Sequence, residues 1–173
     1  MKKTIRTERL LLRPLSEDDF GVMFKIYSDT ETLRYLMDEP WTPETAEEEF
    51  GKRLKLSEGP GGFAYAVISD GRMIGCISAR LTEMEGTWEI GYVFHPSGRH
   101  MGYASEAVRA MAEDLFRNEK AHRLFTDLDA RNTDSAALCE RIGMRLEAHF
   151  IQDCWCKGEW TYSYNYGMLE SDL

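Results

Sequence analysis

The sequence predicts a single α+β (mixed α/β) domain that spans residues 1–173. The length suits one domain with a sizeable core. Three alternating apolar runs between residues 63 and 94 follow one another closely, which is typical of an antiparallel meander. Helical spacing of apolar residues occurs on both sides of that meander. No repeat, low-complexity tract or linker divides the chain, so we expect one core rather than two domains.

Before residue 60 the periodicity predicts a strand, one or two short helices and an acidic helix, at Arg9–Leu15, Gly21–Met37 and Thr42–Leu56. Pro14 closes the strand. Ser16, with Asp19 three residues later, resembles a helix-capping arrangement. Thr42 supplies an N-cap in front of Pro43, a residue that suits the first helical position.

After the loop Glu58–Gly62, strand-like runs replace the helical spacing. The expected strands are Phe63–Ile68, Met73–Leu81, Trp88–Phe94, Leu124–Leu128, Met144–Gln152 and Trp160–Leu169. Asp70-Gly71 and Lys157-Gly158 are turn signals that predict two hairpins. We expect helices at Gly102–Arg117 and Thr133–Ile142, the second ended by Gly143.

The chain carries 21 Lys and Arg against 30 Asp and Glu, a formal charge of −9. A strongly acidic protein is poorly suited to nucleic acid or an anionic membrane, so we expect neither as a partner and favour cationic ones. Four cysteines are too few for a disulfide framework, which indicates a reducing, cytoplasmic location. Cys154 and Cys156 have no second pair at metal spacing, so we expect no metal. The N-terminus lacks an apolar signal region, and no run is long enough to span a membrane.

One segment, Thr87–Ala107, combines a strand, a glycine-containing turn and a helix start. Gly102 and the small Ala104 allow a ligand to approach the backbone, and the helix start presents free amides and a positive dipole end. Arg99 and His100 add positive charge beside it. The pattern indicates a phosphate cradle, although the spacing also fits an ordinary tight turn. It lacks the glycines and lysine of the common nucleotide-binding loops, which argues against a nucleotide-binding protein.

The spacing Arg99-x-x-Gly102-x-Ala104 resembles the Arg/Gln-x-x-Gly-x-Gly/Ala motif of the GCN5-related N-acetyltransferase (GNAT) superfamily. Thr7–Leu15 resembles the opening strand of its RimJ/RimL branch, the ribosomal-protein alanine acetyltransferases. Arg131–Ala136 and Cys139–Met144 are similar to that branch's Asn-x-x-Ser and Glu-Lys-x-Gly-Phe segments. The resemblance covers essentially the whole chain. It implies a GNAT-type fold, with a mostly antiparallel twisted sheet of about seven strands flanked by helices, and acetyl-CoA as cosubstrate.

By this resemblance, the turn amides hold the pyrophosphate of acetyl-CoA, and two strand residues offer backbone groups to the pantetheine arm. The cofactor-binding residues implied are Val93, Phe94, Arg99, His100, Met101, Gly102, Tyr103, Ala104, Ser105 and Asn132. Two roles stay open for Asn132: an N-cap of the following helix, or a hydrogen bond to the cofactor. His100 departs from the family, where glycine is common.

Acetyl transfer needs a neutral amine, and an alkylammonium has a pKa of about 10, so a base must remove a proton. Glu89 is the only acid in the strand that leads into the turn, and Glu85 is a nearby substitute. Expulsion of the thiolate benefits from a donor, for which Ser135 is the candidate. Cys139 stands where relatives outside this branch carry a tyrosine acid. It is either a donor or a buried packing residue, and unaided expulsion also stays open.

Aromatic side chains suit an ammonium acceptor. The candidates are Tyr35, Trp41, Trp88 and Tyr92, with Trp160 and Tyr162 as further ones, and Asp38 and Glu39 could add negative charge. The hypothesis is therefore an N-acetyltransferase that acetylates a protein N-terminus or a small amine by direct attack in a ternary complex. The alternative is a non-catalytic acyl-CoA-binding or sensing module of the same fold. The sequence leaves open whether the protein is a monomer or a homodimer.

Overall fold

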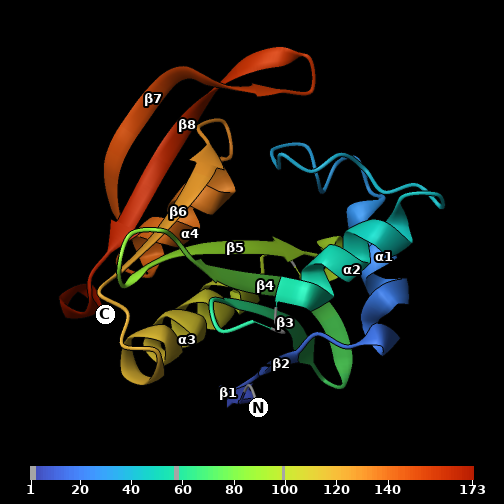
Figure 1. Cartoon of the computed structure of the whole chain (residues 1–173), viewed down its shortest axis with the longest axis horizontal. Coiled ribbons are helices and arrows are strands. Elements are labelled where there is room, and N and C mark those ends of the chain that lie inside the picture. Colours follow the sequence, from blue (N-terminus) through green and yellow to red (C-terminus); the bar gives the residue numbers. More distant parts are fainter. Residues whose placement is uncertain (1–2, 57–58, 99) are drawn as a thin grey trace.

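The structure is a computed structural model that describes residues 3–56, 59–98 and 100–173. Within them, eight strands form one sheet in the order β1-β2-β3-β4-β5-β6-β8-β7 (Figure 1). The strands are β1 Ile5–Arg6, β2 Leu11–Pro14, β3 Gly62–Ser69, β4 Arg72–Leu81, β5 Thr87–Phe94, β6 Arg123–Asp129, β7 Arg145–Cys156 and β8 Glu159–Met168. The α-helices are α1 Phe20–Tyr27, α2 Ala46–Leu56, α3 Tyr103–Asn118 and α4 Thr133–Arg141.

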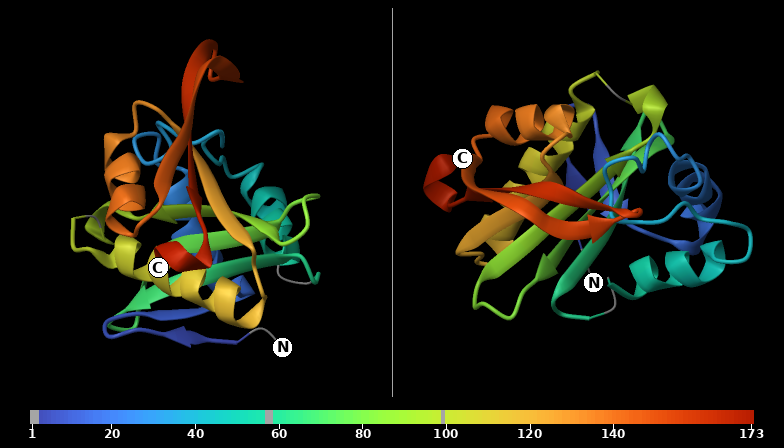
Figure 2. Two further views of the ribbon diagram at one scale, coloured as in Figure 1. Left: turned by 90° about the vertical axis from the view of Figure 1, so that its left-hand side faces the viewer. Right: turned by 90° about the horizontal axis from the view of Figure 1, so that it is seen from above.

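The helices cover the sheet in two pairs, one pair on each face (Figure 2). Met23 of α1 and Phe50 of α2 belong to one buried apolar cluster, which also includes Val93 of β5. Met111 of α3 and Leu138 of α4 belong to a second cluster on the other face. β3 is buried along nearly its whole length because both clusters use it. The predicted α+β class with a mostly antiparallel sheet is therefore confirmed.

The sheet contains one parallel pair, between β5 and β6. This pairing joins Thr87 to Arg123, Trp88 to Leu124 and Glu89 to Phe125, and it covers no further residues of the two strands. Beyond it, β5 continues along β4 as far as Phe94, while β6 continues along β8. The two strands therefore diverge and leave the sheet split at their carboxyl ends.

The predicted hairpin at Asp70-Gly71 is confirmed, and both residues have positive φ, at 48° and 73°. β1 was not expected, because two residues carry no readable periodicity. Residues 28–38 form turns rather than a second helix. The Asp29 carboxylate there accepts a 3.0 Å bond from the Thr32 amide, a local bond that competes with helix formation. Thr42 begins the turn that leads into α2, which itself starts at Ala46.

β7 extends beyond its predicted end at Gln152 and reaches Cys156. Gln152 has a φ of 51°, and the register between β7 and β8 shifts between Phe150 and Cys154. Such a bulge breaks the alternation of side chains, which is why the sequence pattern stops there. The β7–β8 hairpin projects away from the rest of the sheet in two of the views (Figures 1 and 2).

Candidate active site

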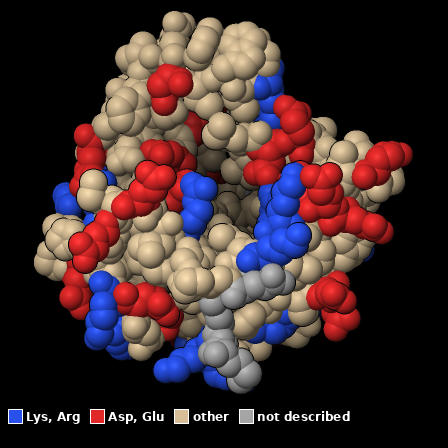
Figure 3. All heavy atoms as spheres, viewed as in Figure 1, with Lys and Arg blue, Asp and Glu red and all other residues tan. Residues whose placement is uncertain are grey.

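A cleft of about 710 Å³ opens where β5 and β6 diverge. Residues 89–94 and 126–129 of the two strands line it, together with the first turns of α3 and α4, residues 31–37 and the β7–β8 hairpin. Figure 3 shows the surface hollowed near its centre, with Lys and Arg on both sides of the hollow and Asp and Glu around them. The cleft therefore brings together residues that lie far apart in the sequence.

The turn before α3 forms one end of this cleft. Gly102 is the N-cap of the helix and adopts a left-handed conformation with φ at 77°, and His100 has φ at 60°. His100, Gly102, Ala104 and Ser105, four of the predicted cofactor-binding residues, line the cleft. The free amides of this first turn and the positive end of the helix dipole suit an anion. Arg99 lies outside the described residues.

Two other predicted cofactor residues of this turn are directed elsewhere. Met101 is 55% exposed and does not line the cleft. Tyr103 packs under the guanidinium of Arg9, whose Cζ lies 4.7 Å from the ring centroid. Both side chains therefore lie outside the cleft, and only their backbone is available to a ligand in it.

Arg141 brings a positive charge to this end of the cleft. It lines the cleft from α4, and its Nη1 donates to Ser105 Oγ at 2.8 Å, which ties α4 to the first turn of α3. Sequence reasoning did not select Arg141. The available signal was its position in the Glu140-Arg141 step of the quoted motif, where the resembled branch has Glu-Lys.

Val93 and Phe94 line the cleft, although their side chains are buried in the two apolar clusters. On one side β5 is hydrogen-bonded to β4 through Phe94, and on the other its pairing with β6 ends at Glu89. The edge of β5 that faces the split is thus available to an extended ligand, in the manner of an added strand.

Asn132 caps α4. Its Oδ1 accepts a 3.1 Å hydrogen bond from the Ser135 amide, so the predicted N-cap role is confirmed. Asn132 also lines the cleft, so its side-chain amide nitrogen stays a candidate for the predicted hydrogen bond to the cofactor.

Ser135 and Tyr92 meet beside the cleft. The Tyr92 hydroxyl lies 2.6 Å from Ser135 Oγ and 3.7 Å from the Sγ of Cys139. Burial raises the pKa of the Tyr92 hydroxyl well above its usual value, so this group stays protonated. Cys139 is fully buried, and burial raises the pKa of its thiol to about 11. Cys139 belongs to the apolar cluster under α3 and does not line the cleft, which favours the packing alternative.

Glu89 lies at the point where β5 and β6 separate, and it lines the cleft. Its Oε2 is paired with Nη2 of Arg80, its cross-strand neighbour on β4, at 2.5 Å. The Glu89 side chain is 33% exposed, so water can reach it. Glu85, the substitute, is exposed in the β4–β5 turn and does not line the cleft.

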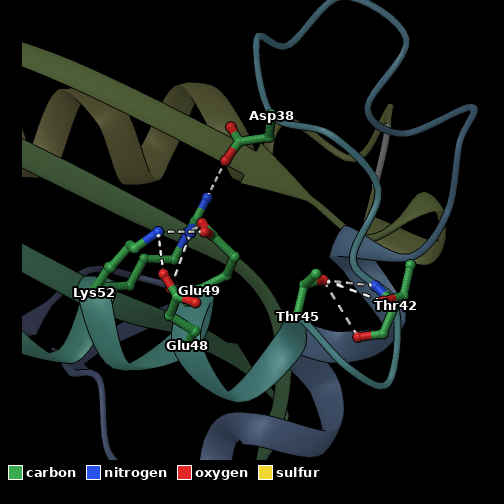
Figure 4. A network of polar contacts seen from close by, with 7 residues as sticks. Asp38, Thr42, Thr45, Glu48, Glu49 and Lys52 are labelled. Carbon is green, nitrogen blue, oxygen red and sulfur yellow. Dashed lines mark hydrogen bonds and ion pairs between the residues drawn. The ribbon is translucent and has the colours of Figure 1, made fainter.

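The end of the cleft opposite α3 is built by residues 29–38 and the β7–β8 hairpin. The Lys157 ammonium, at the tip of the hairpin, donates to the carbonyl oxygens of Leu33 and Leu36. The guanidinium of Arg53 on α2 donates to the Asp38 carboxylate, which points toward α2 in Figure 4. The turn segment is therefore fixed from both sides, to the hairpin and to α2.

The predicted aromatic acceptor residues separate into two groups. Tyr35 and Tyr92 line the cleft, and the Arg131 Cζ lies 5.8 Å from the Tyr35 ring centroid. Trp41 is 4% exposed and stacks on Tyr27 in the α1–α2 cluster. Trp88 is 3% exposed and belongs to the cluster under α3. Neither tryptophan lines the cleft, so the expectation that they contact the acceptor disagrees with their positions.

A split sheet with free helix amides beside the split suits a protein that binds an extended, phosphate-bearing ligand. A family model described as "Acetyltransferase (GNAT) domain" matches residues 9–145. The chain belongs to this family and is an acetyl-CoA-dependent N-acetyltransferase. Among the described residues, no helix has both the length and the apolar character needed to cross a bilayer.

Known relatives agree with this assignment. The chain is 33% identical over 171 residues to the uncharacterised N-acetyltransferase YnaD of Bacillus subtilis, covering 97% of this chain and 98% of the relative. It is 31% identical to a GNAT-family acetyltransferase of Bacillus anthracis, whose crystal structure matches with a TM-score of 0.87 over 98% of this chain and 99% of that one. RimL, a ribosomal L7/L12 alpha-N-protein acetyltransferase solved with coenzyme A, shares the fold at 19% identity, with a TM-score of 0.87 over 96% and 98% of the two chains.

Proposed function

We propose that residues 1–173 form one catalytic domain that transfers the acetyl group of acetyl-CoA to a primary amine by direct attack in a ternary complex. The observation that carries this proposal is the single cleft that joins the α3 turn to Glu89 and Ser135. A donor and an acceptor that meet in one cleft need no covalent enzyme intermediate. The buried, protonated Cys139 is a poor nucleophile, which agrees with direct attack.

For the donor, we place the pyrophosphate at the turn of His100–Ser105, near Arg141, and the pantetheine arm along the open edge of β5. The free amides of α3 favour negative charge, and Arg141 strengthens this locally in an acidic protein. Val93 and Phe94 contribute backbone groups, and the side-chain amide of Asn132 is free to contact the arm. Arg99 remains a predicted contact.

For the acceptor, we propose Glu89 as the general base, acting directly or through a water molecule. Its partial exposure allows both routes, and its ion pair with Arg80 holds the carboxylate at the split. Glu89 is on the last β5–β6 residue pair and lines the same cleft as the α3 turn, which supports this role.

For the leaving group, we propose Ser135 as the hydrogen-bond donor to the departing thiolate. The two hydroxyl oxygens lie 2.6 Å apart, and either can be the donor. In the proposed arrangement Tyr92 donates to Ser135, which leaves the serine hydrogen free to point at the cofactor sulfur. Tyr92 thus acts through Ser135 as a positioning residue. In this step the C–S bond breaks, and its electron pair remains on sulfur.

The acceptor is proposed to be cationic before deprotonation. Among the described residues that line the cleft, six are acidic and four are Lys or Arg. The acidic ones are Glu31, Glu89, Asp127, Asp129, Asp134 and Glu159. Tyr35 and Tyr92 supply aromatic surface for such a group. RimL is a ribosomal L7/L12 alpha-N-protein acetyltransferase. A protein N-terminus and a small amine both fit the chemistry of this cleft. Acetyl-CoA and the four free thiols are consistent with the cytoplasm.

The test is thiol release from acetyl-CoA across a panel of acceptors: short peptides with different N-termini, diamines, polyamines and amino acids. Release that depends on one class identifies the acceptor. The thermal midpoint with and without acetyl-CoA is measured in parallel. Stabilisation by acetyl-CoA with no turnover on any amine would favour the non-catalytic binding module. Neither stabilisation nor turnover would contradict the proposal.

A further inference from the structure

The loop between β1 and β2 is joined to the first turn of α3, almost one hundred residues away in the sequence. Thr7 Oγ1 donates to Glu106 Oε1 at 2.6 Å, and the Arg9 amide donates to the same oxygen at 3.0 Å. The Arg9 Nε donates to Glu106 Oε2 at 2.7 Å. Glu106 therefore receives three hydrogen bonds from one short loop, two of them from Arg9.

Arg9 also reaches the donor turn itself. Its Nη1 donates to the Met101 carbonyl at 2.9 Å, and its guanidinium covers the Tyr103 ring. A Cβ added at Gly102 would lie 3.4 Å from Arg9 Nη2. The Arg9 side chain thus contacts Met101 and Tyr103 and lies beside Gly102 between them, and it does not line the cleft.

Glu106 poses an electrostatic problem for a phosphate ligand at this turn. It lies in the first turn of α3, so its carboxylate stands near the amides that would hold the pyrophosphate. Burial favours protonation of Glu106, but the bonds from Thr7 and Arg9 outweigh it and lower its pKa, so it is charged. An unpaired carboxylate there would repel a diphosphate, and Arg9 neutralises it at close range.

We propose that Arg9 is a positioning residue for the donor site. It fixes the turn Met101–Tyr103 in the conformation that presents its amides, and it screens the charge of Glu106 from the bound pyrophosphate. This inference rests on the proposed placement of the pyrophosphate at the turn. The role is specific to the phosphate-bearing part of the donor, because the pantetheine arm and the acetyl group lie farther along the cleft.

The test compares two acetyl donors. Acetyl-CoA carries the pyrophosphate, and S-acetylpantetheine carries the same thioester without it. For Arg9→Met, kcat/KM with acetyl-CoA should fall about tenfold or more, the usual scale for a lost charge-assisted bond. With S-acetylpantetheine it should stay within about twofold. Arg6→Met, an equal charge change on exposed β1, is the control and should alter neither donor.

A double variant tells whether the loss in Arg9→Met comes from the unscreened charge of Glu106 or from a structural defect. Adding Glu106→Gln to Arg9→Met removes the repulsive charge, so the double variant should recover part of the lost acetyl-CoA affinity, measured as the Kd for CoA. An equal loss with both donors, or a double variant no better than Arg9→Met, would overturn the proposal. If the wild type itself neither binds nor uses acetyl-CoA, the proposed function fails instead. Circular dichroism and the thermal midpoint verify that each variant is folded.

Discussion

The Tyr92 hydroxyl lies 2.6 Å from Ser135 Oγ and so connects strand β5 to helix α4 beside the cleft. If Tyr92 orients the serine, Tyr92→Phe should lower kcat about tenfold, the scale of one lost hydrogen bond in a reacting array, while KM for acetyl-CoA changes little. Tyr164→Phe, another half-buried tyrosine, is the control.

Because Tyr92 is proposed to act through Ser135, the two effects should not add. Ser135→Ala should lower kcat at least as much, and Tyr92→Phe should cost little more in its background. Steady-state kinetics of the two single variants and the double variant give the coupling. Fully additive losses would mean that the two hydroxyls act independently.

Glu89→Gln should lower kcat/KM at neutral pH by about 10²–10⁴-fold, the range of general base catalysis. The deficit should shrink as the pH approaches about 10, because the acceptor amine then loses its proton without help. Rates across a pH series measure this. Glu85→Gln is the control: it removes a carboxylate from the turn that precedes β5, and it should leave the pH dependence of the rate unchanged. A deficit that is constant at all pH values would argue against Glu89 as the base.

Asn132 has a confirmed role in capping α4, and its second role can be separated from it. Asn132→Ala should cost about 1 kcal/mol of stability, which lowers the thermal midpoint by about 2–4 °C. Asn132→Ser keeps an acceptor oxygen for the Ser135 amide and should recover the midpoint. If the amide also binds the cofactor, Asn132→Ser should still bind acetyl-CoA more weakly. Recovery of both properties would assign Asn132 to the cap alone.

The buried Asp19 predicts a pH-dependent part of the stability. Burial favours its protonation, but bonds from Arg13 and Ser16 outweigh burial and lower the Asp19 pKa below the ordinary 3.8. A lowered folded-state pKa contributes stability above 3.8, which is lost as the pH falls through the folded pKa. Asp19→Asn should therefore cost about 2 kcal/mol at pH 7 and distinctly less near pH 3.

Urea unfolding of wild type and Asp19→Asn at both pH values measures this difference. Asp18→Asn, the exposed neighbour, controls for the loss of one carboxylate. A cost that is the same at pH 7 and pH 3 would show that the Arg13 pair does not stabilise the fold through its charge.

Local signals were sufficient for much of the fold. Asp70-Gly71 specified a hairpin because both residues tolerate positive φ, and Asn132 specified the start of α4 because its side chain satisfies a free amide. Gly102 marked the turn before α3 for the same kind of reason, because it adopts a positive φ there. In each case the cause of the local structure lies within a few residues of chain, so the sequence pattern alone can reveal it.

Long-range contacts had no such signal. The bonds from Arg9 to Glu106 and from Tyr92 to Ser135 join residues 97 and 43 positions apart. Trp88 was expected at the acceptor because aromatic surface suits an ammonium, but it lies in the apolar cluster under α3 instead. Residue type alone did not show that α3 covers this face of β5. Such assignments require knowledge of which element packs on which face.

The three residue pairs that join β5 to β6 are the only strand pairing between the sheet's two halves, β1–β5 and β6–β8, in the described chain. Glu89 lies on the last of these pairs, where β5 loses its second neighbour. Past this residue, the edge of β5 that faces the split has no strand beside it among the described residues. In the proposed complex, a donor bound along this edge would complete the sheet with main-chain hydrogen bonds as well as deliver the acetyl group.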